Sequence, residues 1–355
     1  MSRTRSTALR RLLREIGVPL LLLAALDAGF GWYVARHPKL PLPQLFGGDP
    51  LSAGKFLALR DRGLHPPTLD VLLLGMSQMM RVNGELLEAE LGERTGRPVR
   101  AFNFAGPYHS LVFDQFLIRD VVAPIAKPAV VVYGVTPIAL LNEVVPTAPT
   151  EARTAALPIF GVYVGSPVER LRGFAFMHSN LWRYREVIHN ALEFPLGWKG
   201  NWFDDLGHAA TPAGDVPLLG GRHAQVAGLA QAERKQQQRF ADYDAVLRKT
   251  LLFDHLIQFA GFCRQQGIEF VLLNNPVHPL FVNMLPHEQR DYDIYLARLR
   301  QTAAQAHVRL FEPGSNGMGS PELYLDTVHQ DAAGGAWLTE QLAGYLFDNH
   351  LVTAN

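Results

Sequence analysis

Cysteine and net charge are both scarce in this sequence, and each scarcity excludes a class of protein. Cys263 is the single cysteine in 355 residues, which excludes an intrachain disulfide framework and any site built from several thiolates. The 33 basic and 33 acidic side chains cancel, so the chain lacks the basic excess typical of nucleic-acid-binding proteins. Metal-ligand spacing is also missing, and we expect neither a metal nor an organic cofactor. What the chain does have is apolar residues, 48% of the total, which predict a sizeable folded core.

One long apolar run stands near the N-terminus. Residues 16–35 carry a single formal charge, Asp27, and 20 residues are enough to cross a bilayer as a helix. Five arginines lie in residues 1–15, which favours a cytoplasmic tail there and an extracytoplasmic location for all that follows. We therefore interpret residues 16–36 as a single-pass transmembrane signal anchor in the cell membrane. A cleaved signal peptide and a buried core helix are the alternatives, the first disfavoured by the lack of a small-residue cleavage site and the second by length and flanks.

Asp27 stands inside this run, where a carboxylate is costly unless it is paired. It either contacts a partner membrane helix, or it lies near the membrane interface or is protonated.

A proline-rich stretch separates the anchor from the rest of the chain. Six prolines fall between Arg36 and Pro67 inclusive, a spacing that prevents long helices. We interpret residues 37–66 as an extended linker and residues 67–349 as one domain.

Alternating strand and helix patterns dominate that domain. Short apolar runs occur at Val71–Leu74, Val99–Phe104, Val130–Tyr133, Phe270–Leu273 and Val308–Phe311. Residues 288–306 and 335–348 have the pattern of amphipathic helices. Fully apolar strands separated by helices predict a three-layer α/β fold with a five-stranded parallel sheet covered on both faces.

Residues 146–240 have a different character and predict a helical insert. They hold Trp182, Trp198 and Trp202, which either pack a small subdomain or form a carbohydrate-stacking or membrane-interface surface.

Ser77 follows the first predicted strand in the order Gly75-Met76-Ser77-Gln78 and precedes a helical pattern. At that position its hydroxyl projects beyond the sheet edge, where backbone N–H groups point into the same space. A nucleophile can be built there, and the alternative is that Ser77 only caps the helix.

Asp326 and His329 follow the last predicted strand and precede the final helix. A three-residue separation on one turn allows Asp326 to orient the imidazole and to stabilise its protonated form. The alternative is that Asp326 is only a turn residue and His329 only an exposed side chain. The serine and the Asp/His pair follow the first and last strands, however, and the carboxyl ends of parallel strands face one crevice.

These blocks together resemble the SGNH (GDSL-like) hydrolase superfamily. The sequence is similar in particular to a membrane-anchored cell-envelope branch that includes the D-alanyl transfer protein of lipoteichoic acid and the alginate O-acetylation proteins. The resemblance implies a flavodoxin-like domain with Ser77 as nucleophile, His329 as general base and Asp326 as its orienting acid.

Two further blocks follow this pattern less closely. Asn103 and Gly106 stand where the superfamily has an asparagine and an oxyanion-binding glycine. Thr136 replaces the asparagine that normally follows the third strand, so the oxyanion donors remain open. His278, after the fourth strand, either binds substrate or is a structural histidine in a proline-bounded turn.

The sequence thus favours an extracytoplasmic serine acyltransferase or esterase that moves an acyl group, expected to be acetyl, onto or off an envelope polysaccharide. The resemblance implies a membrane-bound O-acyltransferase, or another envelope membrane protein, as partner and a carbohydrate or glycolipid as acceptor. Nucleic acid is not an expected partner. The alternative is a scaffold or binding subunit of an envelope assembly that keeps the sheet without the chemistry.

Overall fold

The structure is a computed structural model of the whole chain. It describes residues 13–36, 50–65, 67–107, 109, 111–123, 125–137, 168, 171, 179–184, 188, 211–215, 252–314 and 320–354. The chain divides into two compact units, residues 1–54 with 152–208 and residues 55–151 with 209–355. The larger second unit holds the whole sheet, and each unit is described by itself.

The described elements are, in chain order, η1 (Leu13–Gly17), α2 (Val18–Arg36), α3 (Pro50–Asp61), β1 (Thr68–Gly75), η2 (Met79–Arg81), α4 (Gly84–Thr95), β2 (Ala101–Asn103), α5 (Leu111–Phe116), η3 (Leu117–Val122), β3 (Lys127–Val135), α10 (Asn180–Arg183), α15 (Leu252–Gln265), β4 (Glu269–Asn274), α16 (Pro279–Val282), α17 (Gln289–Ala306), β5 (Arg309–Phe311), η5 (Pro321–Leu323) and α18 (Ala332–Asp348).

The sheet has five strands in the order β2-β1-β3-β4-β5, and every neighbouring pair is parallel. This is the flavodoxin-like order, in which the direction of winding reverses beside β1. The predicted fold class is therefore confirmed, and each predicted strand is present. The middle strands read as near-continuous aliphatic runs because both of their faces are buried.

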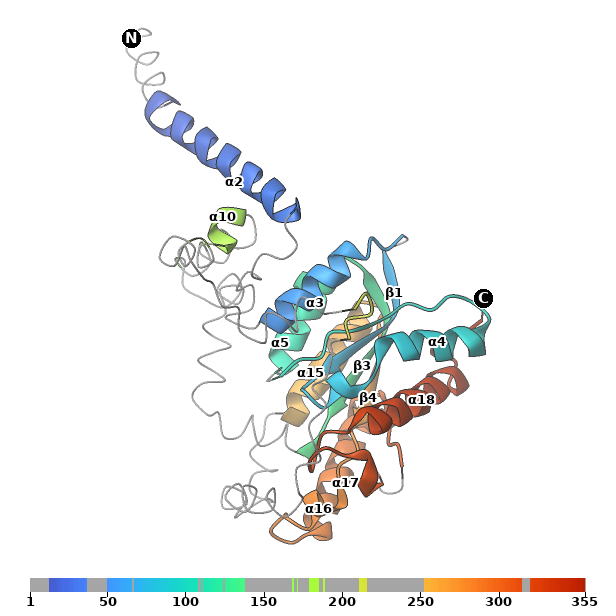
Figure 1. Cartoon of the computed structure of the whole chain (residues 1–355). Helices are drawn as coiled ribbons and strands as arrows, with labels where there is room; N and C mark the ends of the chain where they lie inside the picture. Colours follow the sequence, from blue (N-terminus) through green and yellow to red (C-terminus); the bar gives the residue numbers. More distant parts are fainter. Residues whose placement is uncertain are drawn as a thin grey trace. The chain divides into compact units, whose positions relative to one another are not determined.

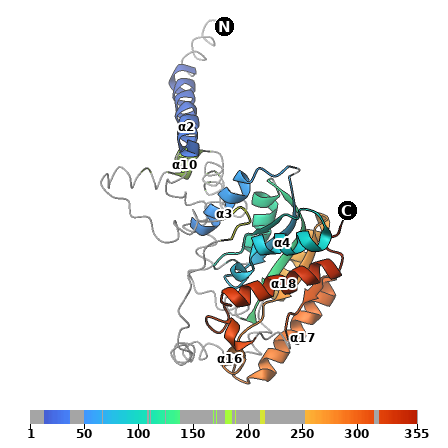
Figure 2. The ribbon, with the colours of Figure 1, turned by 45° about the vertical axis from the view of Figure 1, so that its right-hand side comes forward.

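Helices cover both faces of the sheet, as the ribbon views show (Figures 1 and 2). On one face α4 and α18 pack against each other and against alternate strand residues, which include Val71, Leu73, Val130, Val132, Val271 and Leu273. On the other face lie α5, α15 and α17. There the ring of Phe259 on α15 lies 5.8 Å from the ring of Tyr133 and 5.1 Å from that of Phe270. The alternation along each strand thus decides which layer a side chain enters.

Side-chain caps set the starts of the two helices on the first face. Asn83 Oδ1 accepts a hydrogen bond of 2.7 Å from the N–H of Leu86 at the start of α4. Asp331 Oδ1 accepts one of 2.8 Å from the N–H of Gly334 at the start of α18. A residue that accepts an otherwise unpaired N–H fixes where a helix begins. This explains why α18 begins three residues before the predicted helix.

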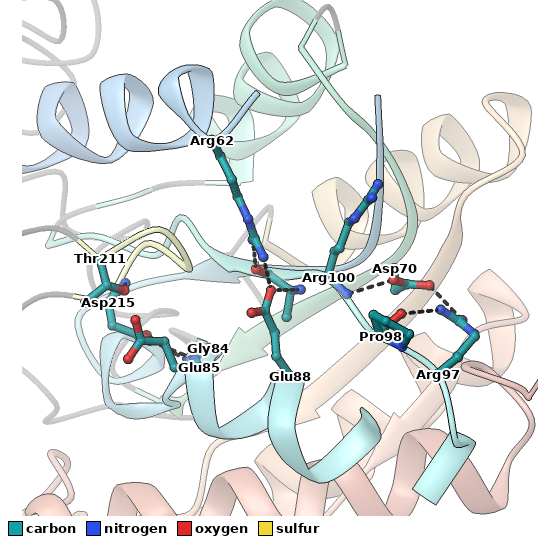
Figure 3. Close-up of polar contacts among 11 residues, drawn as sticks. Arg62, Asp70, Gly84, Glu85, Glu88, Arg97, Pro98, Arg100, Thr211 and Asp215 are labelled. Carbon is teal, nitrogen blue, oxygen red and sulfur yellow. Dashed lines mark hydrogen bonds and ion pairs between the residues drawn. The ribbon is translucent and has the colours of Figure 1, made fainter. Parts of the chain in front are cut away.

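The described end of the insert returns to the sheet domain at residues 211–215. The carboxylate of Asp215 accepts hydrogen bonds from the N–H groups of Gly84 and Glu85, 2.8 and 3.0 Å long (Figure 3). The N–H of Asn103 on the edge strand β2 donates to Ala213 O at 2.7 Å. Burial raises the pKa of Asp215, although the N–H groups of Gly84 and Glu85 favour its charged form. This segment therefore caps α4 and covers the end of the edge strand.

Two charged groups fix β2 beside β1 (Figure 3). Glu88 accepts the N–H of Ala101 at 2.7 Å and pairs with Arg62. Asp70 on β1 accepts the N–H of Arg100 at 2.8 Å. Bonds of this kind from a charged acceptor to the backbone are stronger than neutral ones, which helps a strand of only three residues to hold its register.

The expected extended linker contains a helix, α3, and that expectation was wrong for residues 50–61. Pro50 stands at the helix start, where proline is tolerated, and the helix ends before Pro66. Lys55 is buried and its Nζ donates to the carbonyl oxygens of Asn103 and Ala105 at 2.9 and 2.7 Å. These bonds hold α3 to the loop that follows β2.

The smaller unit contains the N-terminal helix α2. Residues Glu15–Tyr33 are long and apolar enough to span a membrane, and no other helix among the described residues is. Asp27 accepts hydrogen bonds from Ser179 Oγ at 2.6 Å and from the N–H of Leu181 at 2.8 Å. Its described partners therefore belong to the α10 segment of the same chain. Trp182 is part of α10, whereas Trp198, Trp202 and most of residues 146–240 lie outside the described residues.

Candidate active site

Ser77 lies in the turn between β1 and the short helix η2. Gly75 has φ +125°, and a methyl group on it would lie 2.8 Å from Gly134 O on β3. Glycine is needed there because a side chain would meet both backbone strain and the neighbouring strand. The chain therefore leaves β1 sharply and presents Ser77 beyond the sheet edge.

The Ser77 hydroxyl pairs with His329. Its Oγ lies 2.8 Å from His329 Nε2, although 252 residues separate the two in sequence. Ser77 is therefore not a helix cap, because Asn83 caps α4 and η2 has no side-chain cap.

Asp326 holds the other ring nitrogen of His329. Its Oδ2 lies 2.7 Å from His329 Nδ1, and its Oδ1 accepts the N–H groups of Val328 and His329 at 2.8 and 2.6 Å. Burial acts to raise the pKa of Asp326, but the bonds from His329 and the two N–H groups outweigh it and lower the pKa overall. Asp326 is thus held as a carboxylate that accepts the Nδ1 proton, which leaves Nε2 to accept the proton of Ser77.

Arg81, in the same loop as Ser77, adds positive charge to this region. Burial lowers the pKa of its guanidinium, and the nearby carboxylates of Asp326 and Asp331 act in the opposite direction. Arginine stays protonated under such conditions, so the guanidinium remains a positive charge near Asp326.

Two glycines at the start of α18 allow close packing, Gly335 on the segment after Ser77 and Gly334 on the segment before the histidine turn. A methyl group on Gly335 would lie 2.4 Å from Arg81 O, and one on Gly334 would lie 2.2 Å from Leu323 O. The first turn of α18 therefore packs directly on the backbone of η2, four residues after Ser77. A larger residue at Gly335 would force the start of α18 away from η2, and one at Gly334 would force it away from Leu323.

The loop after β4 supports the histidine turn from a second side. The N–H of His278 donates to Thr327 O at 2.9 Å, and Gln330 Nε2 donates to Pro276 O at 3.1 Å. Within the turn, the N–H of Leu325 donates to His329 O at 2.9 Å. These bonds fix the backbone on both sides of His329, as a preorganised site requires.

Asn103 and Gly106 are used differently from the expectation that they bind an oxyanion. Asn103 Nδ2 donates to the carbonyl oxygens of Met79 and Val82 at 3.0 and 2.6 Å, so both amide protons are used. The N–H of Gly106 donates to Gly75 O at 3.2 Å. In this geometry the two residues brace the turn that carries Ser77.

Thr136 and His278 both lie at the same edge of the sheet. Thr136 is buried at the end of β3, and its Oγ1 has no hydrogen-bond partner among the described residues.

His278 Nδ1 accepts the N–H of Leu280 at 2.9 Å and so caps α16, which is the structural one of the two roles considered for it above. Burial lowers the pKa of His278, and Asp326 partly offsets this effect. The neutral ring therefore carries its proton on Nε2.

Donor groups for a developing negative charge remain beside Ser77. The backbone N–H groups of Ser77 and Gln78 make no hydrogen bond within the described part of the chain. Both belong to the turn that presents the hydroxyl, so they are placed to bind an oxygen attached to the atom that Ser77 attacks.

Sequence reasoning missed a buried His–Asp pair beneath the serine turn. His109 Nδ1 lies 3.1 Å from Asp114 Oδ1, and both side chains are buried. A methyl group on Gly106 would lie 2.4 Å from His109 Nε2, so the ring packs against that glycine. The five-residue separation was the available signal, but it does not reveal burial. No cluster of three or more potential metal ligands occurs among the residues that the structure describes.

Comparisons with known proteins give distant likenesses. No family model matches the chain, and no curated protein matches it. A GDSL-like lipase from Bacteroides thetaiotaomicron VPI-5482 is 11% identical with a TM-score of 0.37, covering 86% of this chain and 98% of its own. A protein provisionally described as an acylhydrolase, from Bacteroides fragilis NCTC 9343, is 13% identical with a TM-score of 0.35, covering 82% and 95%. Because these similarities are low, the fold is assigned from the sheet order and the candidate site from its own geometry.

Proposed function

We propose that this protein is an SGNH-type serine acyltransferase or esterase. The observation that carries the proposal is the continuous chain from Ser77 Oγ through His329 to Asp326, with contacts of 2.8 and 2.7 Å. A nucleophile, a base and an orienting acid in this order are what acyl transfer through a serine ester requires.

In the first half of the reaction Ser77 Oγ forms a bond to the acyl carbon while its proton moves to His329 Nε2. The carbonyl electron pair moves onto oxygen and returns when the bond to the leaving group breaks. His329 gives its proton to that leaving oxygen. A second hydroxyl then repeats the sequence in reverse and removes the acyl group from Ser77.

The second hydroxyl decides between hydrolase and transferase. Water makes the protein an esterase, and a hydroxyl of an envelope carbohydrate or glycolipid makes it a transferase. The apolar helix Glu15–Tyr33 supports the transferase, because an anchored domain stays beside a membrane-embedded acyl donor. In this proposal the anchor crosses the inner membrane with its N-terminus in the cytoplasm, the acyl group is acetyl, and a membrane-bound O-acyltransferase is the partner.

A direct test is turnover of a chromogenic acetyl ester by the full-length chain in detergent, alone and with a soluble polysaccharide as acceptor. Activity that Ser77→Ala abolishes supports the serine mechanism, and acetylated polymer among the products supports the transferase. A non-catalytic scaffold predicts no turnover and no labelling of Ser77 by a fluorophosphonate, while membrane partners still co-purify.

A further inference from the structure

Asn275, the residue after β4, carries a side-chain amide that the fold does not use. The residue is 1% exposed, and its Oδ1 is buried with no hydrogen-bond partner among the described residues. Its Nδ2 likewise donates to no described residue. A buried polar group without a partner costs about 1–3 kcal/mol, so such a group in a folded protein calls for an explanation.

Alternation along β4 places this amide on the side of the sheet that holds Ser77. Leu273 belongs to the core formed with α4 and α18, and Asn275, two residues on, points to the same side. Met79 lies in that core as well, and α18 begins directly after the His329 turn. The N–H of Asn275 donates to Val135 O at 2.9 Å, which fixes its backbone beside the end of β3.

Asn274 points to the opposite face and differs in one respect. Its Oδ1 accepts a hydrogen bond of 2.9 Å from Tyr295 Oη on α17. Asn274 Nδ2 has no partner among the described residues, so the difference is that one end of the Asn274 amide is used by the fold, whereas the Asn275 side chain makes no hydrogen bond to the described residues.

The side chain of Asn275 packs against Gly134 on β3. A methyl group on Gly134 would lie 2.4 Å from Asn275 Nδ2 and 2.1 Å from Met79 Cγ. One on Gly75 would lie 3.0 Å from the same Met79 atom. The amide therefore rests on the backbone of β3, against the side chain that follows Ser77 by two residues.

We propose that Asn275 Nδ2 donates a hydrogen bond to the substrate carbonyl oxygen as Ser77 attacks and that oxygen becomes an oxyanion. This inference rests on the proposed acyl-transfer function. The N–H groups of Asn103 Nδ2 and Gly106 already donate to backbone carbonyls. A side-chain donor to the oxyanion must therefore be another residue. Asn275 acts beside the backbone N–H of Ser77 and is a catalytic residue in this reaction.

The test compares Asn275→Ala with Asn274→Ala in the full-length chain, using p-nitrophenyl acetate as substrate. Loss of one oxyanion donor lowers kcat by about 10²–10³-fold, and we expect this for Asn275→Ala with little change in KM. The unfolding midpoint of that variant stays the same or rises, because a buried unpaired oxygen is removed. Asn274→Ala behaves in the opposite way: its midpoint falls as the Tyr295 bond is lost, and its kcat is retained.

A second readout separates catalysis from folding. A trifluoromethyl ketone adds to the serine and places a negative oxygen where the substrate oxyanion forms, and its inhibition constant does not depend on the amount of folded enzyme. We expect Asn275→Ala to weaken this inhibition about 100-fold. Unchanged inhibition or unchanged kcat in Asn275→Ala overturns the inference and leaves the proposed function standing. Failure of the wild-type chain to turn over the ester or to form an adduct at Ser77 overturns both.

Discussion

The His329–Asp326 and His109–Asp114 pairs of the sheet domain differ in their exposure and in what the outer ring nitrogen contacts. The His329–Asp326 pair is partly exposed, with side chains 25% and 31% accessible, and its outer nitrogen meets the Ser77 hydroxyl. The His109–Asp114 pair is buried, at 3% and 0%, and its outer nitrogen packs against Gly106. A histidine beside an aspartate is therefore not enough for catalysis, because it also needs a nucleophile and access for a substrate.

The pKa values of the two carboxyl groups shift in opposite directions. Asp326 accepts two backbone N–H groups besides His329, and its pKa is lowered. Burial dominates at Asp114 and raises its pKa, although His109 and the Gly75 N–H act against it. His329 and the two backbone donors thus keep Asp326 ionised where burial alone would favour its neutral form.

Asp326→Asn gives the largest predicted effect on activity. The amide cannot hold His329 in the tautomer that accepts the serine proton, so we expect kcat to fall by about 10⁴-fold. Steady-state hydrolysis of an acetyl ester measures this. Activity within tenfold of the wild type would mean that the pair does not serve the reaction.

His109→Ala probes the other pair and acts on stability. It removes a buried ring and leaves the Asp114 carboxyl group without its histidine partner, which typically costs about 3–5 kcal/mol in the free energy of unfolding. Urea unfolding measures this cost, with His329→Ala as the matched control. We expect the control to lose about 1 kcal/mol or less, since its pair is partly exposed. Equal losses in both variants would remove the distinction between the pairs.

Gly335→Ala is predicted to separate the catalytic pair from its nucleophile. The added methyl group meets Arg81 O at 2.4 Å and pushes the start of α18 away from the Ser77 turn. A shift of about 1 Å at the reacting groups costs about 100-fold in kcat. Gly344→Ala in the same helix is the control, because its methyl group meets its nearest atom at 3.9 Å. That variant keeps its activity and gains about 1 kcal/mol of stability, so an equal loss of activity in both would contradict the account.

The pH dependence of stability is the smallest predicted effect, and its sign differs between the two acids. The pKa of Asp326 is lowered on folding, so its contribution is present above the ordinary value of 3.8 and is lost as pH falls. The pKa of Asp114 is raised, so its contribution is present below 3.8 and is lost as pH rises. Urea unfolding at a series of pH values checks this. Asp326→Asn should weaken the loss of stability in acid, and Asp114→Asn should weaken the loss above pH 4. The same direction in both variants would contradict the assignment.

Much of the fold could be predicted from the sequence because its signals are local. Aliphatic runs such as Val130–Tyr133 mark strands buried on both faces, and their spacing leaves room for crossover helices. Helix α3 was not predicted because the prolines were expected to prevent helices throughout residues 37–66, although residues 51–65 contain none and Pro50 stands where a helix tolerates it.

The candidate site also has residues whose role could be predicted from the sequence and residues whose role could not. Ser77 could be located because it follows the end of a strand, and the Asp326–His329 turn because an Asp-x-x-His pattern stands just before the final helix. The uses of Asn103 and Gly106 could not, since they depend on which carbonyls approach them in the folded chain. The glycines Gly334 and Gly335 are a visible signal of close packing, but their neighbours, the backbones of Leu323 and Arg81, depend on the folded structure.

The central claim is that Ser77 becomes acylated, and mass spectrometry of the intact chain tests it most directly. The wild-type chain is mixed with an activated acetyl ester, quenched in acid at short times and digested to locate any adduct. The account predicts one acetyl group on Ser77, faster in the wild type than in Asp326→Asn and absent in Ser77→Ala. An unmodified Ser77 throughout turnover, or an acetyl group that persists at another residue in Ser77→Ala with activity intact, would contradict it.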